Sequence, residues 1–251
     1  MRNHPETLAL IAAAGSSSRM SGTDKLFADL CGKPVLVHTL ENYAHASFVD
    51  AIIVVTRKDS IQAVQELIEN WHIGKIHAVI EGGPNRQISV RNALDEIGRR
   101  REEKKFKYIA IADGARCLTK PEWIDRVLTE AYRTDAASAA FPSVDTVKIT
   151  DAQGYVQETP DRKNVWMAQT PQAFRYALYM AAAYSAEKDG FEATDDNALV
   201  ERIEHPVKMV DVGRENLKIT TPLDLVLAQA VLSFRKDQSP CESDKDTTST
   251  D

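Results

Sequence analysis

The sequence has few cysteines and no long apolar run, and each shortage argues against a class of protein. Its 251 residues contain three cysteines, Cys31, Cys117 and Cys241, with no CxxC or paired spacing. This pattern argues against a disulfide framework and a zinc site, and it fits a reducing compartment. Apolar runs such as 8–14 are far shorter than the roughly 20 residues that a membrane-spanning helix needs. The N-terminus lacks a signal-peptide pattern, so we expect a cytoplasmic protein with no membrane partner.

Charge and composition exclude two further classes. Lys plus Arg number 31 and Asp plus Glu number 37, which leaves a net charge of −6. An acidic chain is a poor general binder of nucleic acid, because phosphate backbones attract basic faces. The hydrophobic content of 43% and the charged content of 27% are ordinary for a globular protein and argue against wholesale disorder. The six histidines are scattered without metal-ligand spacing.

Short apolar runs alternate with helical periodicity through the first half of the chain. Near-continuous apolarity predicts strands that are buried on both faces, as in a parallel sheet. Apolar residues at helical spacing lie between them, for example Leu36, Leu40 and Tyr43. We therefore predict an α/β fold: a Rossmann-like, mostly parallel sheet with helices on both faces. The expected strands are 8–14, 51–56, 76–80 and 108–112.

The alternation of strand and helix patterns stops after residue 142. Two short strand-like runs, 147–150 and 155–159, flank a turn at Asp151–Gly154 and predict an inserted β-hairpin arm over about 141–166. Helices are expected at 171–188, from about 195, and after the Thr221-Pro222-Leu223-Asp224 start signal, with a strand at 207–212. Residues 1–234 are thus expected to form one domain, and the polar stretch 235–251 a disordered tail.

Three loops after predicted strands carry candidate chemistry. The first is small and Gly/Ser-rich, with Arg19 and then Lys25 following Gly15. Its backbone N–H groups can hold phosphate oxygens, and the two cations can neutralise them. The loop contains neither GxxxxGK[ST] nor GxGxxG, so a P-loop and a dinucleotide fingerprint are both disfavoured. An ordinary strand–loop connection, with serines that cap turns, is the alternative.

The second and third loops end two later strands. The second, 81–90, has paired glycines that permit close approach of a ligand, with Arg86 and Ser89 after them; a surface arginine and a helix cap are the alternative. The third begins at Asp113, where a carboxylate at a strand end can hold Mg²⁺ between phosphate oxygens. A loop aspartate that caps a turn is the alternative there.

Together these loops resemble those of the 2-C-methyl-D-erythritol 4-phosphate cytidylyltransferase family. The resemblance covers 8–232 in the order and near the spacing of that family. The first loop alone would also suit sugar-nucleotide pyrophosphorylases. The matching segments are AAGSSSRM with Lys25, GGPNRQISV, DGAR, PSVDTVK, TPQ, TDD and GRENLKIT.

The resemblance implies a transfer of the cytidylyl group from CTP to methylerythritol phosphate, in isoprenoid precursor synthesis by the non-mevalonate pathway. It implies a catalytic set that places positive charge around the phosphates: Arg19, Lys25, Arg162 and Lys218. It implies a homodimer in which the arm brings Thr146 and Arg162 to the partner's site. Asp113 would bind Mg²⁺ and lie near the sugar phosphate. The remaining implied substrate-binding residues are Ala13, Ala14, Gly15, Gly83, Arg86, Ser89, Asp113, Gly114, Ala115, Arg116, Thr146 and Thr194.

Four positions depart from the family pattern: Ser17, Ala112, Gly114 and Cys117. Gly114 is expected to loosen the backbone beside Asp113. Three alternatives remain open on the sequence. A ribitol-5-phosphate cytidylyltransferase would use the same loops on a straight-chain polyol. An NAD-linked redox enzyme is disfavoured by the missing glycine fingerprint. A non-catalytic CTP-binding protein would not need the whole set of charged residues.

Overall fold

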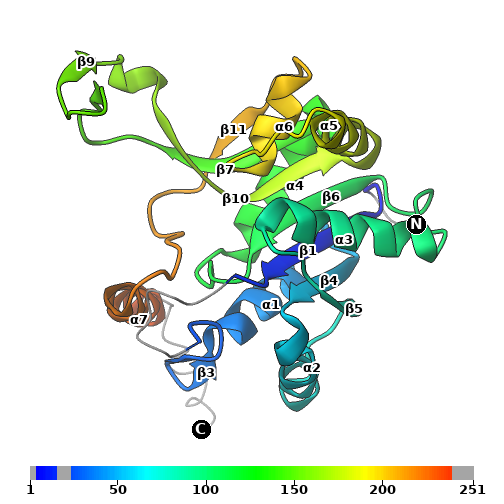
Figure 1. The fold of residues 1–251 in the computed structure, drawn as a ribbon. Helices are drawn as coiled ribbons and strands as arrows, with labels where there is room; N and C mark the ends of the chain where they lie inside the picture. Colours follow the sequence, from blue (N-terminus) through cyan, green and yellow to red (C-terminus); the bar gives the residue numbers. More distant parts are fainter. Residues whose placement is uncertain (1–3, 16–23, 239–251) are drawn as a thin grey trace, which may run out of the picture.

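The computed structural model describes residues 4–15 and 24–238, and its centre is a seven-stranded sheet (Figure 1). The strand order is β11-β7-β10-β6-β1-β4-β5. Neighbours pair in parallel except β10, which runs antiparallel to both β6 and β7. This is the predicted mostly parallel sheet. Its strands are β1 Thr7–Ala13, β4 Ala51–Thr56, β5 Ile76–Glu81, β6 Tyr108–Asp113, β7 Ala136–Pro142, β10 Trp166–Arg175 and β11 Lys208–Asp211.

Helices cover both faces of the sheet because its strands are apolar on both. In β1, Leu8 and Leu10 pack into one core cluster, whereas Ala9 and Ile11 pack into another. The first cluster includes residues of α3 Arg86–Arg99, α5 Tyr176–Lys188 and α6 Asp196–Arg202. The second includes residues of α1 Val35–His45, α2 Ile61–Asn70, α4 Pro121–Thr134 and α7 Pro222–Asp237. The chain thus forms three layers, with the sheet between two layers of helices.

The arm is an extension between β7 and β10 (Figure 1, upper left). It contains the two-stranded sheet of β8 Ile149–Thr150 and β9 Val156–Glu158, followed by the 3-10 turn η2 Arg162–Asn164. The Asp151 backbone carbonyl accepts a hydrogen bond from Gly154, which has a φ of +88°, a conformation that favours glycine. The hairpin predicted at 141–166 is therefore present. A second small sheet, β2 Asp29–Leu30 with β3 Lys33–Pro34, lies before α1, and η1 Lys58–Ser60 precedes α2.

Two predicted boundaries are wrong. Residues 171–175, expected to begin a helix, belong to β10, and the helix starts at Tyr176. The segment is a strand because it pairs with β6 and β7 at once, and such tertiary pairing overrides local helix signals. At the other end, α7 continues to Asp237, past the boundary at 235 from which a tail was expected. Residues 239–251 of that tail lie outside the described part.

The start of α7 agrees with the sequence signal. The Asp224 carboxylate accepts hydrogen bonds from the backbone N–H groups of Thr220 and Thr221, at 2.8 and 2.7 Å. Burial raises the pKa of Asp224, but the hydroxyl of Thr220 and these two N–H groups outweigh burial and hold the pKa below its ordinary value. Within residues 4–15 and 24–238, the helices are all too short or too polar to cross a bilayer.

Candidate active site

A cleft of about 440 Å³ lies beyond the carboxyl ends of β1, β5 and β6. This is the edge of an open parallel sheet at which ligands bind, and the volume is within the roughly 300–1,000 Å³ of small-molecule sites. Ten of the predicted site residues line it: Ala13, Ala14, Gly15, Lys25, Gly83, Arg86, Ser89, Asp113, Ala115 and Lys218. Residues that are far apart in the sequence, Lys25 and Lys218 among them, therefore share one cavity.

Close backbone packing forms the floor of the cleft. A Cβ on Gly82 would lie 2.6 Å from the Cβ of Ala14, and a Cβ on Gly83 would lie 2.2 Å from Cγ2 of Ile88. Both positions therefore exclude any larger residue. Gly82 brings the loop after β5 directly against the end of β1, and Gly83 brings it against the first turn of α3. The result is a wall of small residues on which a ligand can approach the main chain.

Asp113 lies at the centre of the cationic part of the cleft. Its Oδ2 is 3.0 Å from Nζ of Lys218 and 3.5 Å from Nε of Arg116, and its Oδ1 is 3.3 Å from Nε of Arg86. Burial raises the pKa of the Asp113 carboxyl, but the three cations, Lys218 first, outweigh burial and hold this pKa below its ordinary value. Asp113 is therefore ionised at neutral pH, surrounded by more positive charge than it neutralises.

Arg86 is held from behind by a second, buried carboxylate. Its Nη1 forms an ion pair with Oδ2 of Asp196, which is 1% exposed. The other oxygen of Asp196 accepts a hydrogen bond from the hydroxyl of Tyr179 at 2.6 Å, and its backbone N–H donates to Gln172. Burial disfavours the charged form of Arg86, and the carboxylates of Asp196 and Asp113 raise its pKa above the ordinary value. The guanidinium is thereby fixed between two carboxylates.

Ser89 braces the second loop and does not cap the helix. The N-cap of α3 is Asn85, whose Oδ1 accepts the backbone N–H of Ile88 at 2.8 Å. The hydroxyl of Ser89 donates to the carbonyl of Asn85 and accepts the N–H of Gly83. The sequence left open whether Ser89 caps the helix or belongs to the site. The prediction that Ser89 caps the helix is wrong.

Gly114 and Arg116 do not line the cleft. The expectation that Gly114 loosens the backbone is also wrong. Its N–H donates to the carbonyl of Ala12 at 2.9 Å, and its own carbonyl accepts from the hydroxyl of Thr39 at 2.8 Å. The residue is buried, and a Cβ there would already press on three atoms at 3.3 Å. Arg116 contacts Asp113 from the protein side and donates through Nη1 to the carbonyl of Asn216.

Three further predicted residues that the structure describes do not line this cleft. Thr146 and Arg162 are exposed on the arm, where Arg162 donates to the carbonyl of Val144 at 2.9 Å. Thr194 is exposed on the loop before α6. Arg19 lies outside the described residues. The site roles of all four remain predictions.

Sequence reasoning missed two buried groups that support the site. Asp196 belongs to the matched TDD segment, which could cap a helix or lie near the acceptor, and Asn216 belongs to the matched GRENLKIT segment; neither residue was given a role of its own. The cap of α6 is the neighbouring Asp195, which accepts the N–H of Ala198. A helix start needs only one N-cap residue. The second aspartate of the pair was therefore the sequence signal that could have indicated another role for Asp196. Nothing in the local sequence indicated Asn216.

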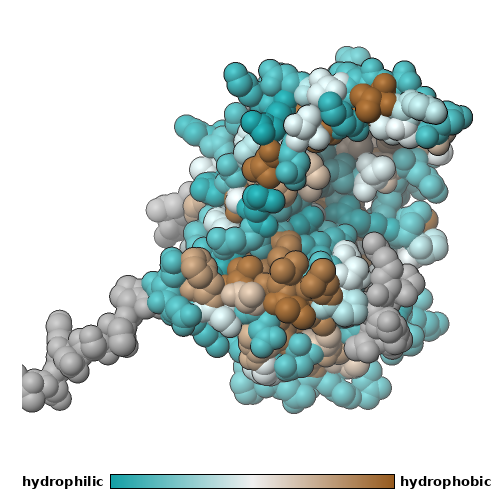
Figure 2. Space-filling model, turned by 90° about the vertical axis from the view of Figure 1, so that its left-hand side faces the viewer, coloured by the Kyte–Doolittle hydropathy of each residue, from teal (hydrophilic) through white to brown (hydrophobic). Residues whose placement is uncertain are grey.

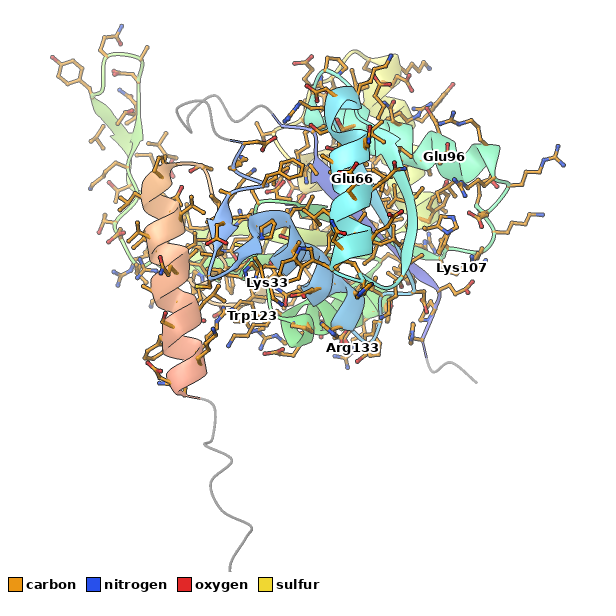
Figure 3. The ribbon with its side chains drawn as sticks, turned by 90° about the horizontal axis from the view of Figure 1, so that it is seen from below. Lys33, Glu66, Glu96, Lys107, Trp123 and Arg133 are labelled. Carbon is orange, nitrogen blue, oxygen red and sulfur yellow. The ribbon has the colours of Figure 1, made fainter. Side chains whose placement is uncertain are left out.

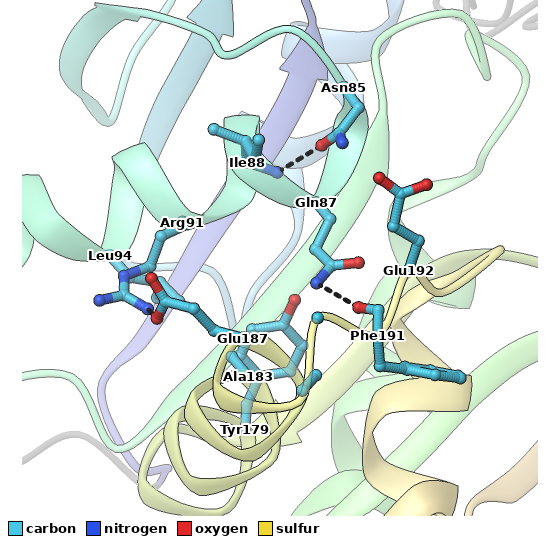
Figure 4. Close-up of a pocket in the computed structure, with 12 residues that line it drawn as sticks. Asn85, Gln87, Ile88, Arg91, Leu94, Tyr179, Ala183, Glu187, Phe191 and Glu192 are labelled. Carbon is cyan, nitrogen blue, oxygen red and sulfur yellow. Dashed lines mark hydrogen bonds and ion pairs between the residues drawn. The ribbon is translucent and has the colours of Figure 1, made fainter.

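A separate pocket of about 210 Å³ lies between α3 and α5 (Figure 4). It is mostly apolar, and an ion pair between Arg91 and Glu187 crosses it at 2.5 Å. A hydrogen bond from Gln87 to the carbonyl of Phe191 joins its two sides. None of the predicted site residues that the structure describes lines this pocket, although Asn85 lines both the pocket and the cationic cleft.

The oxygen atoms available in the cleft suit Mg²⁺ if a bound substrate supplies part of its coordination shell. Among the described residues there is no group of three or more His, Cys, Asp or Glu side chains that could hold a metal by themselves. Asp113 offers carboxylate oxygens in a cleft otherwise lined by small residues and cations. Mg²⁺ typically takes one or two carboxylates and completes its shell with phosphate oxygens and water. The residues therefore fit a metal that arrives with a polyphosphate.

Comparison with known proteins gives one family throughout. The sequence model of 2-C-methyl-D-erythritol 4-phosphate cytidylyltransferase matches residues 7–234. An enzyme of that name from Desulforamulus reducens is 42% identical over 91% of this chain and 96% of its own length. One from Synechocystis is 38% identical over 92% and 98%. The crystal structure of 4-diphosphocytidyl-2C-methyl-D-erythritol synthase from Anaerococcus prevotii superposes with a TM-score of 0.80 at 31% identity, covering 91% of this chain and 96% of that one.

Proposed function

The chain belongs to the 2-C-methyl-D-erythritol 4-phosphate cytidylyltransferase family, and on that premise we propose that its reaction takes place in the cleft around Asp113. The enzyme joins CTP and 2-C-methyl-D-erythritol 4-phosphate to give 4-diphosphocytidyl-2-C-methyl-D-erythritol and pyrophosphate, a step of isoprenoid precursor synthesis. The ribitol phosphate alternative is not favoured, because relatives of about 40% identity over most of the chain carry the methylerythritol name.

The chemistry of the step explains the composition of the cleft. A phosphate oxygen of the acceptor attacks the α-phosphorus of CTP, and the bond from that phosphorus to the pyrophosphate oxygen breaks. The nucleophile is already an anion at neutral pH, so no general base is required. The activation barrier arises because two anions must approach each other and because negative charge develops on the leaving pyrophosphate. Positioning and electrostatic stabilisation therefore supply the catalysis.

One observation carries the assignment of the site: Lys218, Arg86 and Arg116 converge on Asp113 in the cleft that also contains Lys25. We assign Lys25, with Arg19, to the α-phosphate charge and Lys218 to the acceptor phosphate. The small residues 13–15 would cradle the triphosphate. The loop with Gly83, Arg86 and Ser89 would hold the cytosine.

Mg²⁺ is the proposed cofactor. Asp113 would hold it, together with phosphate oxygens of the substrate. When bound, the ion supplies positive charge that neutralises the triphosphate and orients it. Lys218 and the metal would both contact the carboxylate of Asp113. Asp113 would therefore hold two positive charges close to the phosphate of the acceptor.

A homodimer formed through the arm is the proposed assembly. The arm and α7 lie on the same side of the molecule in two views (Figures 1 and 3). Apolar side chains gather in a patch on that face (Figure 2). Exposed Leu223, Val226 and Phe234 follow one side of α7, and the arm exposes Ile149 and Tyr155. A second copy would cover both surfaces and bring its Thr146 and Arg162 to this cleft. The cytosol is the proposed location, in keeping with the sparse, unpaired cysteines.

Pyrophosphate release by the purified chain tests the function. CTP with methylerythritol phosphate should give rapid release, whereas ribitol 5-phosphate as acceptor, or ATP, GTP or UTP as donor, should give little. Faster turnover with ribitol phosphate would overturn the acceptor. CTP binding without turnover with either acceptor would indicate a non-catalytic homologue. NAD binding in place of CTP binding would indicate redox chemistry.

A further inference from the structure

Asn216 is a fully buried amide in the loop between β11 and α7. Its side chain is 0% exposed, and all of its polar atoms are engaged. Nδ2 donates to Oε1 of Gln169 at 3.0 Å and to the carbonyl of Thr170 at 2.9 Å. Oδ1 accepts the hydroxyl of Thr119 at 2.6 Å. A buried polar group with complete hydrogen bonding fixes its segment in one place.

The partners of Asn216 come from the two elements that hold Asp113. Gln169 and Thr170 lie where the pairing of β10 with β7 shifts register. The hydroxyl of Thr170 accepts the backbone N–H of Asp113 at 3.1 Å. On the other side, Arg116, which contacts Asp113, donates to the backbone carbonyl of Asn216 at 2.6 Å. The amide therefore connects its own loop to the surroundings of the central carboxylate.

Lys218 lies two residues after Asn216. The residue that follows Lys218, Ile219, is a second buried residue that fixes the backbone. Ile219 is 0% exposed, and its N–H donates to the carbonyl of Ala115 at 2.9 Å. The Lys218 side chain itself is 39% exposed, and its ammonium reaches Asp113 at 3.0 Å. A lysine side chain loses much rotamer freedom when it is held in one geometry, so its backbone must be fixed independently. The two buried residues provide that fixation.

We propose that Asn216 is a positioning residue, which places the ammonium of Lys218 beside Asp113 to receive the phosphate of the acceptor. This inference rests on the proposed function of the cleft. A primary amide is required at this position, because two donors must meet two carbonyl oxygens while one acceptor meets a hydroxyl. Aspartate has the same shape but no donor. The amide of Gln169 can turn to accommodate it, whereas the backbone carbonyl of Thr170 cannot.

Asn216→Asp in the full chain tests the proposal. We expect kcat/KM for methylerythritol phosphate to fall on the order of ten- to a hundredfold, as for a buried hydrogen-bond group left unsatisfied, with the KM for CTP near that of wild type. Tyr132→Phe is the matched control. It removes a 2.7 Å hydrogen bond to Thr7 at the opposite end of β1, and it should lower the melting temperature without changing either KM.

A double-mutant cycle with Lys218→Ala separates positioning from a merely structural role. If Asn216 acts through Lys218, Asn216→Asp should cost almost nothing further in the Lys218→Ala background. An equal cost in both backgrounds overturns the proposal, as does a wild-type acceptor KM in Asn216→Asp. Should Asn216→Asp fail to fold, Thr119→Val removes one of the same hydrogen bonds and should give a smaller loss of the same kind.

Crystal structures provide a readout that does not depend on the reaction. In Asn216→Asp, the Lys218 ammonium should lie beyond hydrogen-bond distance of Asp113. An unchanged distance contradicts positioning. If the wild-type chain does not transfer the cytidylyl group at all, the proposed function fails. The distance measurement still decides whether Asn216 places Lys218.

Discussion

Arg86 on α3 forms an ion pair with Asp196, the first residue of α6, and the same guanidinium reaches Asp113 in the cleft. One arginine thus joins a buried carboxylate, which is bonded to Tyr179, to the carboxylate at the centre of the site. The relationship makes α6 part of the site although it contributes no residue to the lining of the cleft.

Replacing Asp196 with asparagine should destabilise the fold and weaken CTP binding. The buried charge that holds Arg86 is lost, and a hydrogen bond to a charged group is worth about 1.5–3 kcal/mol. Urea unfolding and CTP titration would measure the two effects. Asp195→Asn is the matched control, because asparagine caps helices as well as aspartate and loses only the hydrogen bond that the second carboxylate oxygen accepts from Gln172. Equal losses in the two variants would remove the special role of Asp196.

Lys25→Ala should abolish most of the turnover while the fold survives. Loss of one preorganised group that stabilises transition-state charge costs about 10²–10³ in kcat. Steady-state pyrophosphate release and a melting curve would measure turnover and folding. Lys58→Ala is the control, because Lys58 is exposed on η1 and does not line the cleft. Near wild-type turnover in Lys25→Ala would exclude this residue from the mechanism.

Two inactive variants should restore activity when they are mixed. Lys218→Ala damages the cleft and Arg162→Ala damages the arm, and each should weaken acceptor binding while largely sparing CTP binding. If the arm completes the partner's site, subunit exchange gives heterodimers in which one site has both residues intact. Activity would be measured before and after co-refolding. No recovery, although subunit exchange is demonstrated, would mean that both residues act within one chain.

Acid should remove the stabilising contribution of Asp113. Its folded pKa lies below the unfolded value, so the contribution is fully present above the unfolded pKa, about 4, and is lost as pH falls through the folded pKa. Unfolding free energies of wild type and Asp113→Asn, measured from pH 6 downward, should differ by a constant amount at first, and wild type should then lose stability faster below about pH 4. A constant difference throughout that range would contradict the depressed pKa.

The sequence predicts the framework of this fold better than its supporting contacts. Strand runs such as 51–56 are identified because apolarity on both faces is a local property. The identity of β10 is not, because Pro171 resembles a helix start until the pairing with β6 is known. Lys25 and Asp113 follow strand ends, where parallel topology brings loops together. The bonds of Asp196 and Asn216 join distant segments, and no local pattern encodes them.

The antiparallel pairing of β7 with β10 has a consequence for how this protein can diverge. The chain leaves the sheet at Pro142 and returns at Trp166, which pairs with it directly, so the two ends of the excursion are adjacent. An insertion or deletion between them changes only the length of the projecting loop and leaves the register of every sheet strand intact. The contacts that we propose for the arm, with the acceptor and with a second copy, can therefore change by exchange of this one segment, while the cleft around Asp113 stays constant.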